Sequence, residues 1–266
     1  MATYVFSDVH GHHRTLERLL EQVSPADEDD IWILGDMVDR GPDPVSVMRT
    51  CRDLKGSHIL LGNHEQMMLD VENDPHDAFA AISWHMNGGD STHKGLEELS
   101  ATERDELISW VRDLPLYAHI NVNERDYLLV HAGLRPLSFS SHSRWNDVTM
   151  DHLLSYQVKD DLLWIREEFW GRRTGLMSYE GKGPIVIAGH TPVPYVQEYA
   201  DVYDRPARDD DGQCQIMRLG AAPGTDQVAD RWAIDCGAAG PAGWGRIAMI
   251  RLDDLKEYYE PVLEGD

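Results

Sequence analysis

Acidic, amide and histidine side chains recur at five points where a short apolar segment of the chain ends. The five clusters are Ser7–Gly11, Gly35–Gly41, Gly62–Glu65, His131–Gly133 and Gly189–Thr191. In open α/β sheets, ligands bind beyond the carboxyl ends of the strands, where neighbouring parallel strands present their side chains together. Mixed oxygen and nitrogen donors suit manganese, iron or zinc better than calcium. We therefore expect these clusters to build a metal site.

Six residues of the clusters are candidate metal ligands: Asp8, His10, Asp36, Asn63, His131 and His190. Six ligands are too many for one open catalytic ion, but they suffice for two ions that share a carboxylate. Two ions about 3.5–4 Å apart can polarise a phosphoryl oxygen and stabilise both ends of an in-line displacement. The pattern therefore predicts phosphoester hydrolysis.

The segments between the first three clusters have the rhythm of βαβ units. We expect strands at Thr3–Ser7, Ile31–Leu34 and His58–Leu61, buried between covering helices. Apolar residues from position 16 to position 23 recur at helical spacing, and a proline suited to a first helical turn opens the segment 44–54. The first two cluster aspartates are 28 residues apart, close to the length of one βαβ unit. The clusters should therefore meet at one edge of a parallel sheet.

The rest of the chain is expected to complete a single domain over residues 1–266. Residues 75–115 have the composition of a helical insertion, and a proline closes it. Further strands are expected at 118–122, 127–130, 184–188, 231–234 and 246–252. Residues 195–230 are expected to form a hairpin insertion that shapes access to the site, with a turn at Asp209–Gly212.

These motifs resemble, in the same order along the chain, those of the calcineurin-like metallophosphoesterases. The resemblance is to the bacterial and phage-type serine/threonine phosphatase branch of the phosphoprotein phosphatase superfamily. It rests on Asp8-x-His10, Gly35-Asp36-x-x-Asp39-Arg40-Gly41, Gly62-Asn63-His64-Glu65, His131-Ala132-Gly133 and Gly189-His190-Thr191. The segments Leu163–Glu167 and Ile234–Ala238 resemble two further motifs of that branch. Residues 84–92 resemble its W-x-x-N-G-G-x-x-T segment, which we interpret as support for the site.

The resemblance implies a four-layer α/β/β/α sandwich with a small helical insertion, and it implies two divalent metal ions. Manganese is the first expectation, with iron or zinc as alternatives. Asp8, His10 and Asp36 would bind the first ion, and Asp36, Asn63, His131 and His190 the second, with Asp36 bridging. The remaining nine histidines, His12 among them, are interpreted as surface or core residues.

The resemblance also implies roles for four residues around the metals. His64 would be the general acid that protonates the leaving oxygen, and Asp39 would orient it. Arg40 and Arg166 would bind the phosphate oxygens, because guanidinium offers paired donors to them. The alternative for Arg166 is an ion pair with a neighbouring glutamate.

The implied activity is dephosphorylation of phosphoserine or phosphothreonine proteins, with phosphotyrosine also open, by a hydroxide held between the metals. Two alternatives are symmetrical hydrolysis of dinucleoside tetraphosphates and hydrolysis of small phosphomonoesters. The tetraphosphatase subfamily typically lacks an equivalent of Asp39 and has Asp where this chain has Glu65, so the sequence favours the phosphatase. A non-catalytic metal-binding scaffold is a further alternative, which the complete set of ligands disfavours.

Composition limits the partners of the chain. Its 24 basic and 47 acidic residues give a formal net charge of −23, which disfavours general binding of nucleic acids or anionic membranes. The three cysteines are too few and scattered for a disulfide framework, and no run of about 18 apolar residues could span a bilayer. We therefore expect a cytoplasmic protein whose partner is a phosphoprotein or a small phosphoester.

Overall fold

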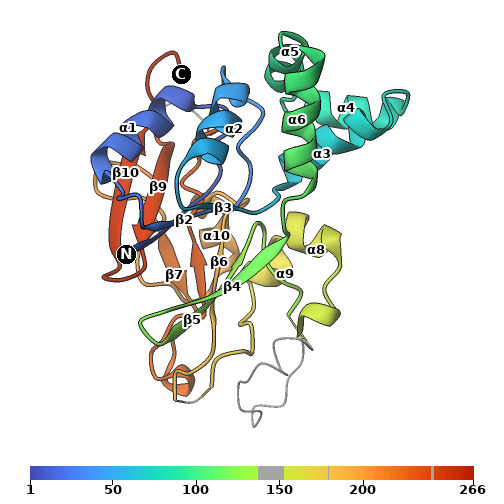
Figure 1. Cartoon of the computed structure of the whole chain (residues 1–266). Helices are drawn as coiled ribbons and strands as arrows, with labels where there is room; N and C mark the ends of the chain where they lie inside the picture. The colour runs from blue at the N-terminus through green and yellow to red at the C-terminus, as the bar shows by residue number, and fades with distance from the viewer. Residues whose placement is uncertain (137–152, 179, 241–242) are drawn as a thin grey trace. The chain divides into compact units, whose positions relative to one another are not determined.

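The computed structural model describes residues 1–136, 153–178, 180–240 and 243–266 (Figure 1). The chain forms two compact units. Unit 1 comprises Met1–Pro115 and Gly237–Asp266, and unit 2 comprises Leu116–Cys236. Each unit contains a five-stranded sheet together with helices, which confirms the predicted α/β class.

The sheet of unit 1 has the strand order β10-β9-β1-β2-β3. Its strands are β1 (Thr3–Phe6), β2 (Asp30–Ile33), β3 (Ser57–Ile59), β9 (Arg246–Arg251) and β10 (Lys256–Pro261). β1, β2 and β3 run parallel, as expected, whereas β9 is antiparallel to β1 and to β10. The carboxyl ends of the three parallel strands therefore lie at the same edge of this sheet.

Helices α1 (His13–Val23) and α2 (Pro44–Asp53) follow β1 and β2. α1 packs against β9 and β10 because its apolar stripe is buried there, with Leu16 and Leu19 fully covered. The side chain of Asp43 caps α2 by accepting a hydrogen bond from Ser46 N at 3.1 Å. These helices are the connections that parallel pairing requires.

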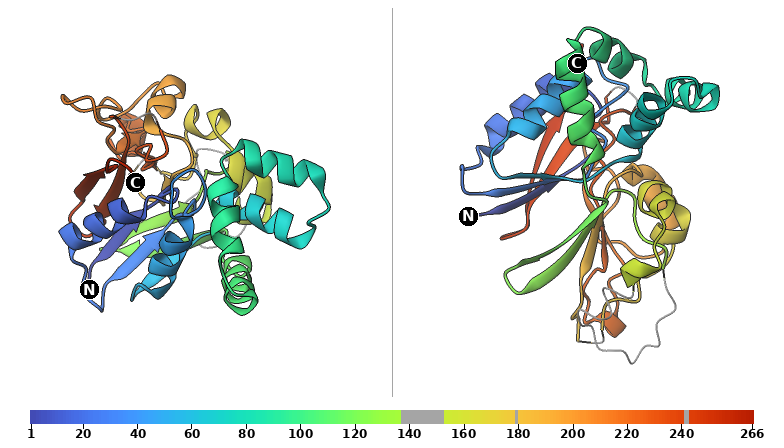
Figure 2. Two further views of the ribbon diagram at one scale, coloured as in Figure 1. Left: turned by 90° about the horizontal axis from the view of Figure 1, so that it is seen from above. Right: turned by 45° about the vertical axis from the view of Figure 1, so that its right-hand side comes forward.

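Unit 1 has four further helices, which are α3 (Asn63–Asn73), α4 (Ala78–Met86), α5 (Asp90–Glu97) and α6 (Ala101–Arg112). Of these, α4, α5 and α6 lie within the helical insertion predicted at 75–115, whereas α3 precedes it and was not predicted. Figure 2 shows all four gathered as one group beside α1 and α2. Contacts of α3 with α4 and α6, and of α5 with α2, hold the group together.

One expectation for the parallel strands is wrong at β3, which is an edge strand. β1 is buried along its whole length, but the side chain of His58 on β3 is exposed. The imidazole stacks on Trp32 of β2 with ring centroids 4.4 Å apart. His58 Nε2 also lies 3.1 Å from a carboxylate oxygen of Asp30. An edge strand has a neighbour on one side only, so polar residues are tolerated on it.

Unit 2 has a second mixed sheet with the strand order β4-β5-β6-β8-β7. Its strands are β4 (Tyr117–Val122), β5 (Arg125–Val130), β6 (Ile185–Ala188), β7 (Met217–Leu219) and β8 (Arg231–Ala233). β5, β6 and β8 are parallel, and β4 and β5 form a hairpin. The two turn residues of the hairpin, Asn123 and Glu124, both have positive φ, as tight hairpin turns prefer.

Short helices complete unit 2: α8 (Lys159–Trp164), α9 (Glu167–Trp170), α10 (Val193–Tyr199) and the 3₁₀ turn η1 (Pro223–Thr225). Between α10 and β8, isolated antiparallel bridges pair Tyr203 with Leu219 and Arg208 with Cys214. Gly212 N donates to Asp209 O at 3.0 Å, which closes the expected turn. Among the described residues of both units, the helices all fall short of the length and apolarity needed to cross a bilayer.

Candidate active site

The predicted ligands of unit 1 lie just beyond the ends of its parallel strands. Asp8 and His10 follow β1, Asp36 follows β2, and Asn63 is the first residue of α3 after β3. All four side chains are buried. His10 Nε2 lies 3.6 Å from an Asp36 oxygen, so carboxylate and imidazole donors meet at this edge. We call this part of unit 1, with the neighbouring residues 39, 40, 64 and 65, the unit 1 rim.

The loops of the unit 1 rim have an unusual backbone. Asp8, His10 and Asp36 all have φ near +50°, a conformation that residues other than glycine rarely adopt. His10 N donates to Asp36 O at 2.9 Å, and Asp8 N donates to Gly35 O at 3.1 Å. A strained backbone persists only where its surroundings over-determine it, and it concentrates at functional sites. The two ligand loops are therefore locked to each other through their main chains.

Glu65 locks these loops further through its fully buried carboxylate. One carboxylate oxygen accepts hydrogen bonds from Asp36 N at 2.8 Å and Gly62 N at 3.0 Å. The other accepts from Met37 N at 2.7 Å and Val38 N at 3.2 Å. Burial and the nearby Asp36 charge raise the pKa of Glu65 to about 7, against the opposing effect of these donors. One side chain thus fixes the loops after β2 and β3 together.

Asp39 and His64 form a buried pair, with His64 Nδ1 2.6 Å from Asp39 Oδ2. The indole Nε1–H of Trp84 donates to both Asp39 oxygens at 3.0 Å. The hydroxyl of Thr92 donates to Asp39 Oδ1 at 2.6 Å and accepts from Asp39 N at 2.9 Å. Residues 84–92 therefore orient Asp39, which agrees with the supporting role predicted for this segment.

The exposed side chain of Arg40 reaches across the rim to two imidazoles. Its Nη2 lies 2.9 Å from His64 Nε2, and its Nη1 lies 3.3 Å from His10 Nε2. The main-chain N–H of Arg40 donates to Gly88 O at 2.9 Å. A Cβ on Gly88 would lie only 2.8 Å from Arg40 Cγ, so glycine is needed there for the close approach. The guanidinium is held where it can donate to an acceptor at the rim.

The pKa values of the two imidazoles of the rim, His10 and His64, are shifted in opposite directions. Burial, together with the positive charge of Arg40 and His64, lowers the pKa of His10 well below its usual value. Burial also acts to lower the pKa of His64, but the Asp36 and Asp39 carboxylates outweigh it and raise that pKa. A neutral imidazole suits a metal ligand, and an imidazole that holds a proton suits a general acid.

The unit 1 rim fits a divalent cation. His10, Asp36 and His64 each offer a ligand atom within 4.8 Å of the other two. Asp8 adds a further buried carboxylate, and buried carboxylates require a compensating charge. Both ring nitrogens of His64 already contact Asp39 and Arg40, so we keep His64 as the predicted acid and not as a ligand.

Unit 2 brings together its own predicted residues. His131 follows β5 and His190 follows the parallel strand β6, and their ring centroids are 5.1 Å apart. His190 has φ +62°, and the ring of Trp164 meets it edge to face at 5.9 Å. Arg166 Nη1 donates to His190 O at 3.4 Å. We call these residues the unit 2 rim.

Sequence reasoning missed two features of unit 1. The first is the structural role of Glu65, which the sequence analysis used only to distinguish two subfamilies. Its carboxylate accepts four main-chain hydrogen bonds. The signal that could have shown this role is its place as the third residue of α3 after Gly62, which is the position of the acidic residue in a capping box. The second is a cavity lined by His12 and Arg40; the burial of His12 itself agrees with its interpretation as a surface or core residue. The position of His12 two residues after His10 was the available signal.

Comparison with known proteins places the sequence in a family. A family model described as calcineurin-like phosphoesterase matches residues 1–225. A symmetrical bis(5'-nucleosyl)-tetraphosphatase of Proteus mirabilis (strain HI4320) is 40% identical over 139 residues, 51% of this chain and 46% of that protein. Its counterpart in Acidovorax sp. (strain JS42) is 34% identical over 174 residues, 64% and 54% of the two chains. The chain spans about half the length of the curated relatives it matches.

Solved structures share the fold. A candidate diadenosine tetraphosphatase has a TM-score of 0.58 at 18% identity, covering 99% of this chain and 95% of that one. A protein serine/threonine phosphatase from Saccharomyces cerevisiae has a TM-score of 0.51 at 13% identity, covering 99% and 80%. At such identities the likeness concerns the fold alone. Because the family model matches most of the sequence, and because its strand ends carry the predicted motifs, the chain belongs to the calcineurin-like phosphoesterases.

Proposed function

We propose that this chain hydrolyses dinucleoside tetraphosphates symmetrically, yielding two nucleoside diphosphates. The observation that carries the proposal is the similarity to relatives named symmetrical bis(5'-nucleosyl)-tetraphosphatases, at 40% identity over 139 residues in the first of them. The sequence motifs alone favour a protein phosphatase over a tetraphosphatase, because of Asp39 and Glu65. The similarity to the named relatives favours the tetraphosphatase, and the proposal follows it.

The proposed metal ligands are those predicted from the sequence, four in the unit 1 rim and two in the unit 2 rim. They are Asp8, His10, Asp36 and Asn63, and His131 and His190. Two divalent ions bound there, manganese in our proposal, would supply Lewis-acid stabilisation of the phosphoryl charge. The burial of Asp8 and Asp36 and the low proton affinity of His10 support this assignment.

Arg40 and His64 would act as a pair on the scissile phosphate. In the structure Arg40 donates to His64 Nε2, which requires that nitrogen to be an acceptor and the ring to be neutral. A phosphate oxygen is a better acceptor for guanidinium, so it would take over the Arg40 donors. His64 Nε2 could then hold a proton, which the Asp39 contact favours, and donate it to the leaving oxygen.

The leaving group of a symmetrical cleavage is a nucleoside diphosphate oxygen, which departs more readily when it is protonated. Asp39 would keep the imidazole oriented and stabilise its charge, and Trp84 and Thr92 would keep Asp39 in place. Arg166 would donate to a second phosphate oxygen from the unit 2 rim. Its half-buried guanidinium, next to the His190 carbonyl, supports that role.

The second candidate is hydrolysis of phosphomonoesters, on phosphoserine or phosphothreonine proteins or on small molecules. The observation that favours it is the complete Asp39–His64 pair, which suits a poor leaving group that needs a proton. Both candidates use the same residues, so the substrate must be tested directly.

The test is a parallel assay of the manganese-loaded protein. Its substrates are diadenosine tetraphosphate, a phosphoserine peptide, a phosphotyrosine peptide and an aryl phosphate. We expect chelator-sensitive cleavage of the tetraphosphate with the highest kcat/KM, detected as adenosine diphosphate by chromatography. A higher kcat/KM on a phosphopeptide would overturn the proposal in favour of the protein phosphatase. Bound metal without turnover of any substrate would instead favour the scaffold alternative.

A further inference from the structure

Unit 1 contains a cavity of about 600 Å³ that the metal ligands do not line. It is lined by His12, Arg40, Ala238–Gly240, Gly243, Gly245 and Val262–Asp266. Arg40, whose guanidinium contacts His64, is therefore a residue of both this cavity and the unit 1 rim. The volume of the cavity lies within the range of small-molecule sites, about 300–1,000 Å³.

We propose that this cavity binds one nucleoside of the dinucleotide substrate. The inference rests on the proposed function and deepens it by giving one end of that substrate a place in unit 1. In this arrangement Arg40 binds the phosphate at the edge of the cavity, and the sugar and base extend inward.

His12 supplies the first argument for a polar ligand. The residue is only 8% exposed, and its buried Nδ1 has no hydrogen-bond partner among the residues that the structure describes. A buried polar atom without a partner is energetically unfavourable, so such an atom in a residue that lines a cavity marks where a ligand can bond. A ribose hydroxyl or a nitrogen of a base could provide the missing partner.

The charge of the opposite wall selects the kind of ligand. Glu264 and Asp266 both line the cavity. Carboxylates repel phosphate but accept hydrogen bonds from ribose hydroxyls and exocyclic amino groups. The phosphate of a ligand would therefore stay at Arg40, and its uncharged hydroxyl-bearing and amino-bearing part would face the carboxylates. A nucleoside has this distribution of groups.

The glycine-rich wall suits a flat ring. Gly240, Gly243 and Gly245 present main chain without side chains to the cavity. A Cβ on Gly245 would lie 2.1 Å from Gly237 O, so the two ends of the segment pack too closely for any side chain at that position. Gly243 differs, because a Cβ there would meet no atom within 4 Å, so its main chain is open to an approaching ligand. A base could therefore lie against this wall.

The segment that carries Glu264 and Asp266 is fixed to helix α1. The Asp266 carboxylate accepts hydrogen bonds from Thr15 N at 2.6 Å and from Thr15 Oγ1 at 2.5 Å. Leu263 N donates to the same hydroxyl at 3.1 Å. These bonds satisfy donors of the first turn of α1 and hold residues 263–266 in place. The cavity is thus preformed, which lowers the cost of binding.

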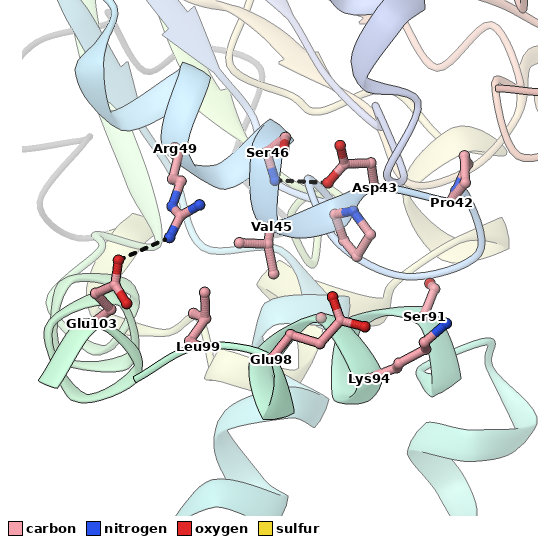
Figure 3. A pocket seen from close by; sticks show the side chains of 12 residues that line it. Pro42, Asp43, Val45, Ser46, Arg49, Ser91, Lys94, Glu98, Leu99 and Glu103 are labelled. Carbon is pink, nitrogen blue, oxygen red and sulfur yellow. Dashed lines mark hydrogen bonds and ion pairs between the residues drawn. The ribbon is translucent and has the colours of Figure 1, made fainter. Parts of the chain in front are cut away.

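A second cavity of nearly equal volume provides a matched control. It measures about 590 Å³ and lies between α2 and helices α5 and α6 (Figure 3). Arg49 crosses it to pair with Glu103 at 3.4 Å. Ser46 is a small half-buried residue of this cavity, as Ala239 is of the proposed nucleoside site. Leucine at either position would fill part of the respective cavity.

The test compares Ala239→Leu with Ser46→Leu in the full chain. Binding of adenosine, which carries no phosphate, is measured by ligand-observed NMR in the presence of a chelator, so neither bound metal nor a phosphate contact with Arg40 contributes. We expect Ala239→Leu to weaken adenosine binding, and to raise KM for diadenosine tetraphosphate, by about tenfold or more. Ser46→Leu should change neither, and kcat/KM for an aryl phosphate should stay unchanged in both variants.

His12→Phe is the second variant, because it keeps the ring volume and removes Nδ1. It should weaken adenosine binding by about 3- to 10-fold while circular dichroism shows an unchanged fold. Adenosine binding that is equal in wild type, Ala239→Leu and His12→Phe would overturn the nucleoside site. So would a loss of phosphopeptide turnover in Ala239→Leu without any loss of adenosine binding, which would assign the cavity to a peptide.

These outcomes separate the nucleoside site from the proposed function. If the wild type cleaves diadenosine tetraphosphate but both variants match it, the cavity assignment fails and the function stands. If the wild type binds adenosine in this cavity but leaves the tetraphosphate intact, the function fails and the cavity remains a nucleoside site.

Discussion

The rims of the two units place their histidines in the same way, just beyond parallel strands, but differ in the backbone conformation of the residues around them. In both, the side chains follow neighbouring parallel strands. In the unit 1 rim, five non-glycine residues have positive φ: Asp8, His10, Asp36, Asp39 and Arg40. In the described part of the unit 2 rim, His190 is the non-glycine residue with this conformation. The unit 1 rim therefore stores more backbone strain.

Because the unit 1 rim has more residues with positive φ, its neighbours must hold the backbone as well as the side chains. A strained loop keeps its shape only when other groups hold it. In unit 1 those groups are Glu65, which binds four main-chain N–H groups, and Trp84, which holds Asp39. We therefore expect substitutions around the unit 1 rim to disturb geometry as well as chemistry.

The largest effect is expected for His64→Asn, which removes the candidate general acid. Turnover should fall by about 10²–10⁴, because a positioned acid contributes about that much to rate. Metal content, measured by plasma mass spectrometry, should remain close to that of wild type, since His64 is not assigned as a ligand. His85→Asn, at an exposed histidine of α4, is the control and should change neither. Unchanged turnover in His64→Asn would exclude its role as the acid.

The positions of the candidate metal ligands in unit 1 could be predicted from the sequence, because parallel strands leave little freedom in where their ends lie. Three short apolar segments separated by helical stretches must place their ends at one edge of a sheet, and the structure has β1, β2 and β3 parallel. The strand bounds agree with expectation to within a few residues. β10 was missed because Lys256–Pro261 contains charged residues and lacks a clear apolar run.

Long-range contacts account for most of what the sequence did not predict. Trp84 and Asp39 are 45 residues apart, so no local pattern shows that the indole holds the carboxylate. The cavity beside His12 is closed by residues more than 220 positions further along the chain. Spacing rules apply within one βαβ unit, whereas such contacts depend on how distant segments pack.

An intermediate effect is expected for Glu65→Gln, which tests the clamp without a large change of volume. The amide group presents two donors where the carboxylate had an acceptor, so two of the four main-chain donors lose their partner. The free energy of unfolding should fall by about 2 kcal/mol or more. Urea unfolding in the presence of a chelator measures this change apart from metal binding.

The control for this change is Glu21→Gln on the exposed face of α1, which should stay within about 0.5 kcal/mol of wild type. If Glu65→Gln is as stable as the control, the four hydrogen bonds do not stabilise the unit 1 rim. The contrast between the rims would then have to rest on Asp39 and its partners.

The smallest effect is expected when one tryptophan at each rim, Trp84 or Trp164, is replaced by phenylalanine. Trp84→Phe removes the N–H that donates to both Asp39 oxygens, whereas Trp164→Phe keeps an aromatic edge against His190. We expect kcat to fall by about tenfold in Trp84→Phe, the equivalent of one lost charge-assisted hydrogen bond, and by less than about threefold in Trp164→Phe. A purely structural loss would lower stability and leave kcat of the folded enzyme unchanged. The ratio of kcat in each variant to kcat in wild type, measured at matched metal content, therefore decides whether the Trp84 indole acts through Asp39 on His64. If this ratio is equal for Trp84→Phe and Trp164→Phe, the two tryptophans do not distinguish the rims.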